Sequence, residues 1–445
     1  MSVKHTILKG TIILTLTGFA TRFMGFFYRI FLSHTFGEEG VGLYQLVFPV
    51  YALCFSLTCA GIETALSRCV AKRMSAGKEG EARKLLFTGL VLSVGASCIV
   101  TLLLQRYARP VALYFLKEER CENFLVILSY AFPFAAVHSC IAGYYLGMKE
   151  TKIPAYSQLV EQAVRILSVY LFYLAGLKNG VHFGISIAVA GLVTGEIASS
   201  FFCFRQISRN LFLYKKTGKT KCSVLSYGKY AKELLFLASP LTASRVLLNI
   251  LQSVEAVSIP LKLQQYGMTS YNALSIYGVL TGMALPCILF PSAITNSVST
   301  MLLPTVAEAQ TLGHRGRMRV IIKKSIFYCV LLGSGCGICF LLLGKWIGYY
   351  LFTSAMAGKF IVTLAWICPF LYTNTTLISI INGIGKTTLS FCINTAGLGI
   401  RIAGVFFGIP AFGISGYLWG LLLSQIFTFL ISSGYLRWYI LREKI

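Results

Sequence analysis

Apolar runs long enough to cross a lipid bilayer recur along the whole chain. A membrane-spanning helix needs about 20 consecutive, mostly apolar residues. Because backbone polar groups must be satisfied within the hydrocarbon region, such runs predict helices, and the chain is expected to be an all-α integral membrane protein. We predict twelve spans, at residues 9–32, 42–68, 85–105, 123–147, 154–176, 182–204, 233–258, 272–303, 322–344, 359–382, 387–408 and 412–436.

The charge distribution supports a membrane protein and gives an orientation. Only 12% of the residues are charged, against about 25% in soluble domains. The net charge of +25 would otherwise suggest nucleic acid, but the basic residues gather in the loops that follow the even-numbered spans. The positive-inside rule explains this pattern, places both termini in the cytoplasm and predicts no nucleic-acid partner. The first span lacks a small-residue cleavage site and is expected to remain uncleaved.

The two halves of the chain repeat one another. Residues 147–166 align with 383–402, and at the same offset 70–83 align with 306–319. Six spans per half mean that both copies enter the membrane from the same side, as in transporters built from parallel repeats. We therefore predict two six-helix lobes with a cleft between them. The predicted parts are an N-terminal lobe at 1–230, a basic cytoplasmic tether at 205–232 and a C-terminal lobe at 231–445.

The first span carries two arginines, Arg22 and Arg29, on the same helical face as Gly18 and Gly25. Each arginine in the middle of a membrane costs roughly 2.5–3.5 kcal/mol on insertion scales. A chain that carries this cost twice on one face is expected to line a wet, positively charged cavity.

The repeat extends this pattern to the second half. It aligns Arg22 with Arg245 and Arg165 with Arg401, whereas Arg29 falls opposite Gln252. Guanidinium groups match phosphate oxygens bidentately and stay charged. We therefore predict a central cavity that holds a phosphate or pyrophosphate group. Its expected residues are Arg22, Arg29, Arg245, Asn249, Gln252, Asn296 and Arg401.

A structural role is the alternative for some of these charges. Glu161 lies four residues before Arg165, in the favourable order for an ion pair along one helix. Glu63 is a candidate partner for one of the cavity arginines. Membrane-embedded acids also mark ion and proton relays, so Glu63, Glu196 and Glu255 are candidates for coupling to a proton or to sodium.

No motif for enzyme chemistry is present in the sequence. There is no HExxH, no clustered set of Cys and His ligands and no arrangement typical of a catalytic triad. The expectation is a transporter with no metal site and no cofactor, driven by a proton, by sodium or by the membrane potential.

Three blocks carry a family resemblance: residues 15–51, residues 143–167 and residues 290–310. They resemble the stage V sporulation protein B group of polysaccharide-biosynthesis membrane proteins. That group belongs to a superfamily of multidrug and oligosaccharidyl-lipid exporters that includes the MurJ-type lipid II flippases. In MurJ-type relatives the first-span arginines are needed for transport, and they correspond here to Arg22 and Arg29. Members often have fourteen spans, two more than are expected here.

The resemblance implies an alternating-access flippase of undecaprenyl-pyrophosphate-linked saccharides for peptidoglycan or another surface polymer, in the cell membrane. Its expected partners are a lipid-linked oligosaccharide, membrane lipid and proteins of cell-envelope polymer synthesis. Two alternatives stay open. One is a cation-coupled multidrug exporter, which would favour an acidic residue in the first span. The other is a non-transporting scaffold for polymer synthesis that uses the basic tether.

Overall fold

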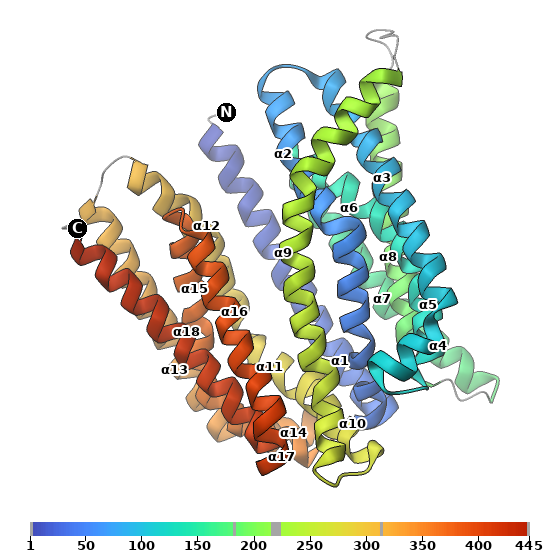
Figure 1. Cartoon of the computed structure of the whole chain (residues 1–445), viewed down its shortest axis with the longest axis vertical. Helices are drawn as coiled ribbons and strands as arrows, with labels where there is room; N and C mark the ends of the chain where they lie inside the picture. The colour runs from blue at the N-terminus through green and yellow to red at the C-terminus, as the bar shows by residue number, and fades with distance from the viewer. Residues whose placement is uncertain (1–2, 181–183, 215–223, 312–314, 443–445) are drawn as a thin grey trace. The chain divides into compact units, whose positions relative to one another are not determined.

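The computed structural model describes residues 3–180, 184–214, 224–311 and 315–442. These residues form helices joined by short connections, and no strand occurs among them (Figure 1). The prediction of an all-α chain is therefore confirmed.

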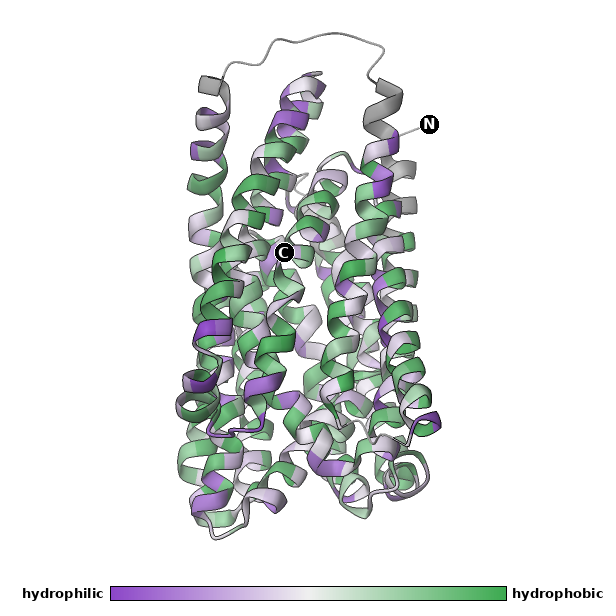
Figure 2. Ribbon diagram, turned by 90° about the vertical axis from the view of Figure 1, so that its right-hand side faces the viewer, coloured by the Kyte–Doolittle hydropathy of each residue, from purple (hydrophilic) through white to green (hydrophobic). Residues whose placement is uncertain are grey.

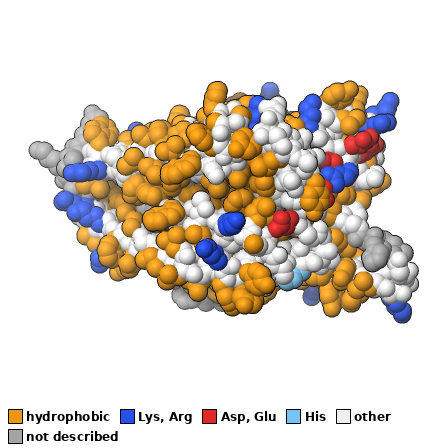
Figure 3. All heavy atoms as spheres, turned by 90° about the horizontal axis from the view of Figure 1, so that it is seen from below, with side chains coloured by type: hydrophobic (Ala, Val, Ile, Leu, Met, Phe, Trp, Pro, Cys, Tyr) orange, Lys and Arg blue, Asp and Glu red, His pale blue; other side chains and the backbone are white. Residues whose placement is uncertain are grey.

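Among the described residues, ten helices are long and apolar enough to cross a membrane, and a pair bent by 43°, Cys121–Ser129 and Ala131–Gly147, brings the number to eleven. One of the ten, Ile12–Ser75, is 64 residues long and contains two of the predicted spans. The count therefore agrees with the prediction of twelve. Hydrophobic residues run along the helices in Figure 2 and cover much of the face seen in Figure 3. Phe236 and Phe407, each 79% exposed, are typical of side chains that face lipid.

The first helix, α1, runs from Val3 to Phe55 and is interrupted at Gly37. The backbone of Gly37 has φ 68° and ψ −176°, a conformation that favours glycine because it has no Cβ. The predicted loop between the first two spans is thus reduced to a break within one long helix. A π-helical segment, η1 (Ser56–Ala60), then leads into α2 (Gly61–Ser75).

The chain divides into two compact units, and two long helices, α1 and α9, each contribute residues to both units. Unit 1 comprises Met1–Gly25 and Leu46–Ser253, and unit 2 comprises Phe26–Gln45 and Val254–Ile445. This division differs from the predicted lobes at 1–230 and 231–445, because a middle stretch of α1 joins unit 2 and the first part of α9 (Val224–Gln265) joins unit 1. The predicted tether at 205–232 lies partly outside the described residues, at 215–223.

Close helix packing at glycines explains why the middle of α1 belongs to unit 2 and the first part of α9 belongs to unit 1. A Cβ on Gly61 of α2 would lie 1.9 Å from Thr242 Oγ1, so the first part of α9 packs tightly on unit 1. A Cβ on Gly42 of α1 would lie 2.2 Å from the carbonyl oxygen of Leu274, which holds the middle of α1 against unit 2. Small residues let helix backbones approach closely in membrane proteins, where apolar side chains alone give little preference for one neighbour.

Unit 1 packs α6 against α2, α3 and α8, and α7 against α8. Its core includes Leu66, Leu85, Tyr145 and Leu234, each fully buried. Besides α2 and its parts of α1 and α9, this unit contains α3 (Glu79–Arg106), α4 (Ala108–Pro110), the π-helical η2 (Val111–Leu116), α5 (Cys121–Ser129), α6 (Ala131–Gly147), α7 (Lys152–Lys178) and α8 (Ser186–Tyr214).

Unit 2 packs α15 against α12, α13 and α18, and α16 against α18. Its core includes Val306, Ile322, Leu377 and Leu436. Its helices are α10 (Ser270–Gly278), π-helical η3 (Val279–Ala284), α11 (Leu285–Leu289), α12 (Ser292–Thr311), α13 (Arg315–Phe352), α14 (Ala355–Leu364), 3-10 helical η4 (Ala365–Ile367), α15 (Cys368–Gly383), α16 (Thr387–Ala403), π-helical η5 (Gly404–Gly408), α17 (Ile409–Phe412) and α18 (Ile414–Arg442).

Candidate functional site

Arg22 lies on the part of α1 that belongs to unit 1, and its side chain is exposed. Within the described residues, its guanidinium has no hydrogen bond and no ion pair. Next to it on α1, Thr21 donates its hydroxyl to the carbonyl oxygen of Gly18, and Phe19 and Phe23 are both exposed. Arg22 is therefore a positive charge on a largely apolar helix, and none of its donors is used by the part of the chain that the structure describes.

Arg245 is also exposed, but it is anchored within unit 1. Its Nη1 donates to the carbonyl oxygen of Ala60 at 3.0 Å, and its Nη2 donates to Thr64 Oγ1 at 3.1 Å. Asn249, one turn further along α9, donates to the carbonyl oxygen of Ala52 at 3.2 Å and to Ser56 Oγ. Two of the predicted cavity residues thus contact η1 and the residues beside it, where the π-helical turn disturbs the regular backbone hydrogen bonds.

Arg29 makes a contact of the same kind within unit 2. Its Nη1 lies 3.4 Å from the carbonyl oxygen of Thr281 and 3.3 Å from that of Gly282, both in the π-helical η3. Arg29 and Arg245 therefore each donate to backbone carbonyls of a π-helical segment. The prediction that Arg22 and Arg245 lie in different lobes stays a prediction; in the structure both residues belong to unit 1, and Arg29 belongs to unit 2.

The remaining predicted polar residues are less well placed for a ligand. Gln252 is exposed on α9 and Asn296 is half-buried on α12. On the same helix as Asn296, the hydroxyls of Ser292, Thr295 and Ser299 are buried and donate to carbonyl oxygens one turn earlier. These three hydroxyls donate to backbone carbonyl oxygens of the protein and are not directed into an open cavity.

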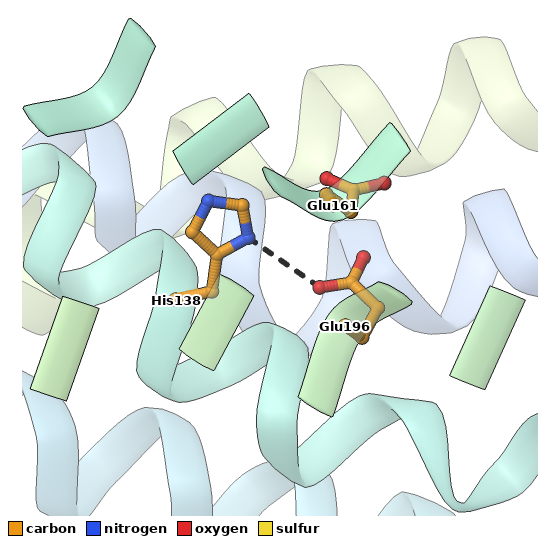
Figure 4. A group of neighbouring side chains, drawn as sticks. All are labelled: His138, Glu161 and Glu196. Carbon is orange, nitrogen blue, oxygen red and sulfur yellow. Dashed lines mark hydrogen bonds and ion pairs between the residues drawn. The ribbon is translucent and has the colours of Figure 1, made fainter. Parts of the chain in front are cut away.

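A buried ionic cluster forms where α6, α7 and α8 meet in unit 1 (Figure 4). The ion pair expected between Glu161 and Arg165 is present, with Arg165 Nη2 2.5 Å from Glu161 Oε1. Glycines on α8 bring this pair close to Glu196. A Cβ on Gly195 would lie 2.9 Å from the carbonyl oxygen of Glu161 and 3.3 Å from Arg165 Cβ.

The carboxylate of Glu196 receives two further groups. Tyr51 donates its hydroxyl to Oε1 at 2.8 Å, and His138 Nδ1 lies 3.4 Å from Oε2. The His138 and Glu196 side chains are only 13% and 5% exposed. One possible ligand atom from each of His138, Glu161 and Glu196 lies within 4.8 Å of the other two. The cluster therefore holds two carboxylates, one guanidinium and one imidazole in a small volume.

Glu63 on α2 lies beside this cluster. Its Cγ would be 3.1 Å from a Cβ on Gly143 of α6, and its carboxylate interacts electrostatically with both His138 and Arg245. That Glu63 neutralises one of the candidate arginines stays a prediction, and Arg245 is the arginine with which its carboxylate interacts.

Unit 2 contains a different buried arrangement around Arg401. The Arg401 Nε donates to Glu255 Oε1 at 2.8 Å, and Tyr417 donates its hydroxyl to the same oxygen at 2.8 Å. The Glu255 side chain is 4% exposed. Arg401 was expected to bind substrate and Glu255 to bind a coupling ion, but each neutralises the other in the structure. Both therefore have less charge to offer to a ligand.

Unit 2 also has an apolar groove of about 720 Å³ between α14, η4 and α15 on one side and α18 on the other. Trp366 and Trp419 line it, and both are exposed. Lys359 contributes the one charged side chain among its lining residues. A groove of this composition suits an apolar chain that carries an anionic group near one end.

Sequence reasoning missed His138, Tyr51 and Tyr417. His138 could have been noticed as a lone imidazole in the middle of an apolar span, which is rare enough to suggest a functional site. Tyr51 and Tyr417 carry no such signal, because tyrosine is common in membrane helices and only the fold shows which carboxylate each hydroxyl meets.

Comparison with known proteins gives the family. Residues 7–310 match the model of the polysaccharide biosynthesis protein family. The chain is 31% identical to stage V sporulation protein B of Bacillus subtilis (strain 168) over 338 residues, which cover 74% of this chain and 64% of that protein. It is 24% identical to the lipid II flippase MurJ of the same organism over 324 residues, which cover 69% of this chain and 59% of that protein. The chain thus spans less than two thirds of the length of both relatives.

The fold agrees with this assignment. A solved structure of lipid II flippase MurJ in an inward closed conformation superimposes with a TM-score of 0.73 at 16% identity, covering 96% of this chain and 87% of that one. The chain therefore has the fold of that structure, as the family resemblance implied. Because the family model matches more than half of the sequence, this multi-pass membrane chain belongs to the polysaccharide biosynthesis protein family.

Proposed function

We propose that this protein is a flippase that moves an undecaprenyl-pyrophosphate-linked saccharide across the cell membrane by alternating access, and that Arg22 binds the pyrophosphate. The observation that carries the proposal is the exposed Arg22 guanidinium, which has no polar partner among the described residues and lies on an apolar helix. A membrane protein gains little from such a group unless a ligand or water meets it.

The other arginines suit supporting roles. Arg245 uses two of its five donors on unit 1 and keeps an exposed side chain, so it can hold a second phosphate oxygen while its position is fixed. The apolar groove lined by Trp366 and Trp419 offers a surface for the prenyl chain. The charge of the loops further supports cytoplasmic termini, and a relative is named as a lipid II flippase.

The test is a flipping assay in proteoliposomes with a fluorescent undecaprenyl-pyrophosphate-linked saccharide. Replacing Arg22 with Ala is expected to lower the flipping rate at least tenfold, and Arg22→Lys to have an intermediate effect, because lysine keeps the charge but loses the bidentate fork. Arg106→Ala, at the exposed end of α3, is the matched control and should leave the rate unchanged.

An Arg22→Ala protein that flips the lipid at the normal rate would refute the role of this residue. No flipping by the wild-type protein, combined with export of cationic drugs from expressing cells, would instead favour a multidrug exporter. No transport of either kind would favour a scaffold for polymer synthesis.

A further inference from the structure

In the ionic cluster of unit 1, the His138 ring has contacts with serine hydroxyls as well as with a carboxylate. The side chain of His138 meets oxygen atoms at both ring nitrogens. Nε2 lies 3.0 Å from Ser157 Oγ, and Nδ1 lies 3.2 Å from Ser199 Oγ and 3.4 Å from Glu196 Oε2.

Both serine hydroxyls also lie within hydrogen-bonding distance of a backbone carbonyl oxygen. Ser157 Oγ donates to the carbonyl oxygen of Pro154 at 2.9 Å, and Ser199 Oγ donates to that of Glu196 at 3.0 Å. Each hydroxyl has a single hydrogen, so a serine that donates to its backbone carbonyl presents a lone pair to the imidazole. An imidazole surrounded by acceptors at both nitrogens is satisfied only when both nitrogens carry hydrogen, as in the imidazolium ion.

The charges of the cluster point to the same protonation state. The carboxylates of Glu161 and Glu196 face one permanent cation, Arg165, so a neutral His138 leaves one negative charge uncompensated. Burying an unpaired charge is costly, and one bound proton on His138 removes that cost. Because imidazole titrates near neutral pH, this proton can be gained and lost under physiological conditions.

Among the residues that the structure describes, the groups packed around α6 supply no second permanent cation to balance the carboxylates of Glu161 and Glu196. Glu63 on α2 adds a negative charge, which Arg245 faces. Tyr51 of α1 is a hydrogen-bond donor to Glu196, and η1 contributes the thiol of Cys59. The charged residues of α3 lie in its first turns and at its last residue, and that of α5, Glu122, lies in its first turn.

The protonated state also links several helices of unit 1. His138 is on α6, Glu161 is on α7 and Glu196 is on α8 (Figure 4). Arg165 is also on α7, and Tyr51 is on α1. When His138 loses its proton, one ring nitrogen becomes an acceptor, and a serine hydroxyl must turn from its backbone carbonyl to donate to it. Since the Glu161 and Arg165 side chains keep 15% and 14% of their surface exposed, the cluster is not sealed from exchange.

We propose that His138, held between Glu196, Ser157 and Ser199, is a proton-binding site that supplies the coupling ion for transport. This inference deepens the proposed function, and its first test does not depend on transport. Loading converts the imidazole to imidazolium and neutralises the cluster. Release returns the proton to water and leaves one net negative charge on the Glu161, Glu196 and Arg165 group.

The first experiment is ¹⁵N NMR of the full chain in lipid bilayers, with labelled histidine and with the other four histidines replaced by Gln, so that only His138 reports. Two protonated ring nitrogens are expected at pH 6, with one of them lost reversibly as the pH is raised to 9. A neutral ring at every pH, or two protonated nitrogens throughout, would overturn the proposal. So would Mn²⁺ that binds at the cluster and broadens the His138 signal, because the group would then be a metal site.

The second experiment applies a pH gradient across the proteoliposomes used for lipid flipping. The gradient is expected to change the wild-type rate several-fold, and His138→Gln should abolish this response. The matched control is His34→Gln, since His34 Nε2 meets the carbonyl oxygen of Leu351 in unit 2, outside the cluster. A wild-type flipping rate that is the same with and without the pH gradient would refute coupling. An Arg22→Ala protein that no longer flips the lipid but keeps the NMR titration of His138 would support a proton site that is independent of the substrate site.

Discussion

The repeat places one arginine at the same position in each half of the chain, and the two arginines have different surroundings. Arg165 in unit 1 takes its carboxylate from Glu161 on its own helix, and a second carboxylate and an imidazole lie beside the pair. Arg401 in unit 2 has Gly397 four residues earlier and takes its carboxylate from Glu255 on α9, with Tyr417 completing the group.

This difference separates a fixed ion pair from an exchangeable one. In unit 2 one positive and one negative charge cancel, and the tyrosine adds a hydrogen bond without changing the balance. In unit 1 two carboxylates face one guanidinium, so the balance depends on whether His138 carries a proton. Related halves of one fold can thus give one unit a permanent structural tie and the other a site that responds to protons.

The largest effect is expected when the fixed pair is broken. Replacing Glu255 with Gln leaves the Arg401 guanidinium without its countercharge, and removing one partner of a buried pair costs about 3 kcal/mol or more. Denaturant unfolding in detergent micelles measures this loss, which should be the same at pH 6 and at pH 8. The Glu255→Gln, Arg401→Leu double variant should regain part of it. A single variant as stable as the wild type would show that the pair is not structural.

The packing of α7 on α8 gives the second effect. Gly195→Ala places a Cβ 2.9 Å from a backbone oxygen of Glu161, which must move, at a cost of about 2 kcal/mol. In unit 2, Gly397→Ala meets the hydroxyls of Thr428 at 2.9 Å and Ser424 at 3.3 Å, which can turn away, so its cost should be smaller. Unfolding free energies of the two variants test this order. The reverse order would mean that the α7–α8 contact is not tightly constrained.

A smaller and pH-dependent effect is expected for Glu161→Gln. This change removes a charge-assisted hydrogen bond to Arg165, worth about 1.5 kcal/mol. When His138 is neutral, Arg165 and Glu196 still cancel, whereas a protonated His138 leaves one excess positive charge. The destabilisation should therefore be greater at pH 6 than at pH 8, unlike that of Glu255→Gln. Equal losses at both pH values would contradict an exchangeable proton in unit 1.

The smallest effects are expected from the two tyrosines. Tyr417→Phe and Tyr51→Phe each remove one 2.8 Å hydrogen bond to a carboxylate, at a cost of about 1 kcal/mol. The Tyr417 variant should lose slightly more, because Glu255 then keeps only Arg401, whereas Glu196 still has His138. Thermal unfolding of both proteins compares them. A larger loss for Tyr51→Phe would place the rigid group in unit 1 instead.

The fold was largely predictable because its strongest constraint is local. Each span is a run of consecutive apolar residues, and such a run can be recognised without knowing which helices it packs against. The division into units was not predictable in the same way. Whether residues 26–45 of α1 and the first part of α9 belong to one unit or the other depends on contacts such as those at Gly42 and Gly61, between residues far apart in the sequence.

The same distinction applies to the candidate sites. The Glu161–Arg165 pair follows from a spacing of four along one helix, so it could be predicted. The partner of Arg401 is Glu255, on a helix much earlier in the chain, and no local pattern joins the two. The proposal that His138 binds a proton depends on the oxygen atoms around both ring nitrogens, which only the structure shows. Arg22 could be chosen from sequence because its depth in an apolar span is itself the unusual feature.

The central claim is that Arg22 binds the pyrophosphate of a lipid-linked saccharide, and equilibrium binding to the purified protein tests it most directly. Undecaprenyl-pyrophosphate-linked saccharide should bind the wild type, with at least tenfold weaker binding to Arg22→Ala and unchanged binding to Arg106→Ala. Binding that falls as the salt concentration rises would agree with a charge-dependent contact. Equal affinity of the wild-type and Arg22→Ala proteins for the lipid would contradict the account.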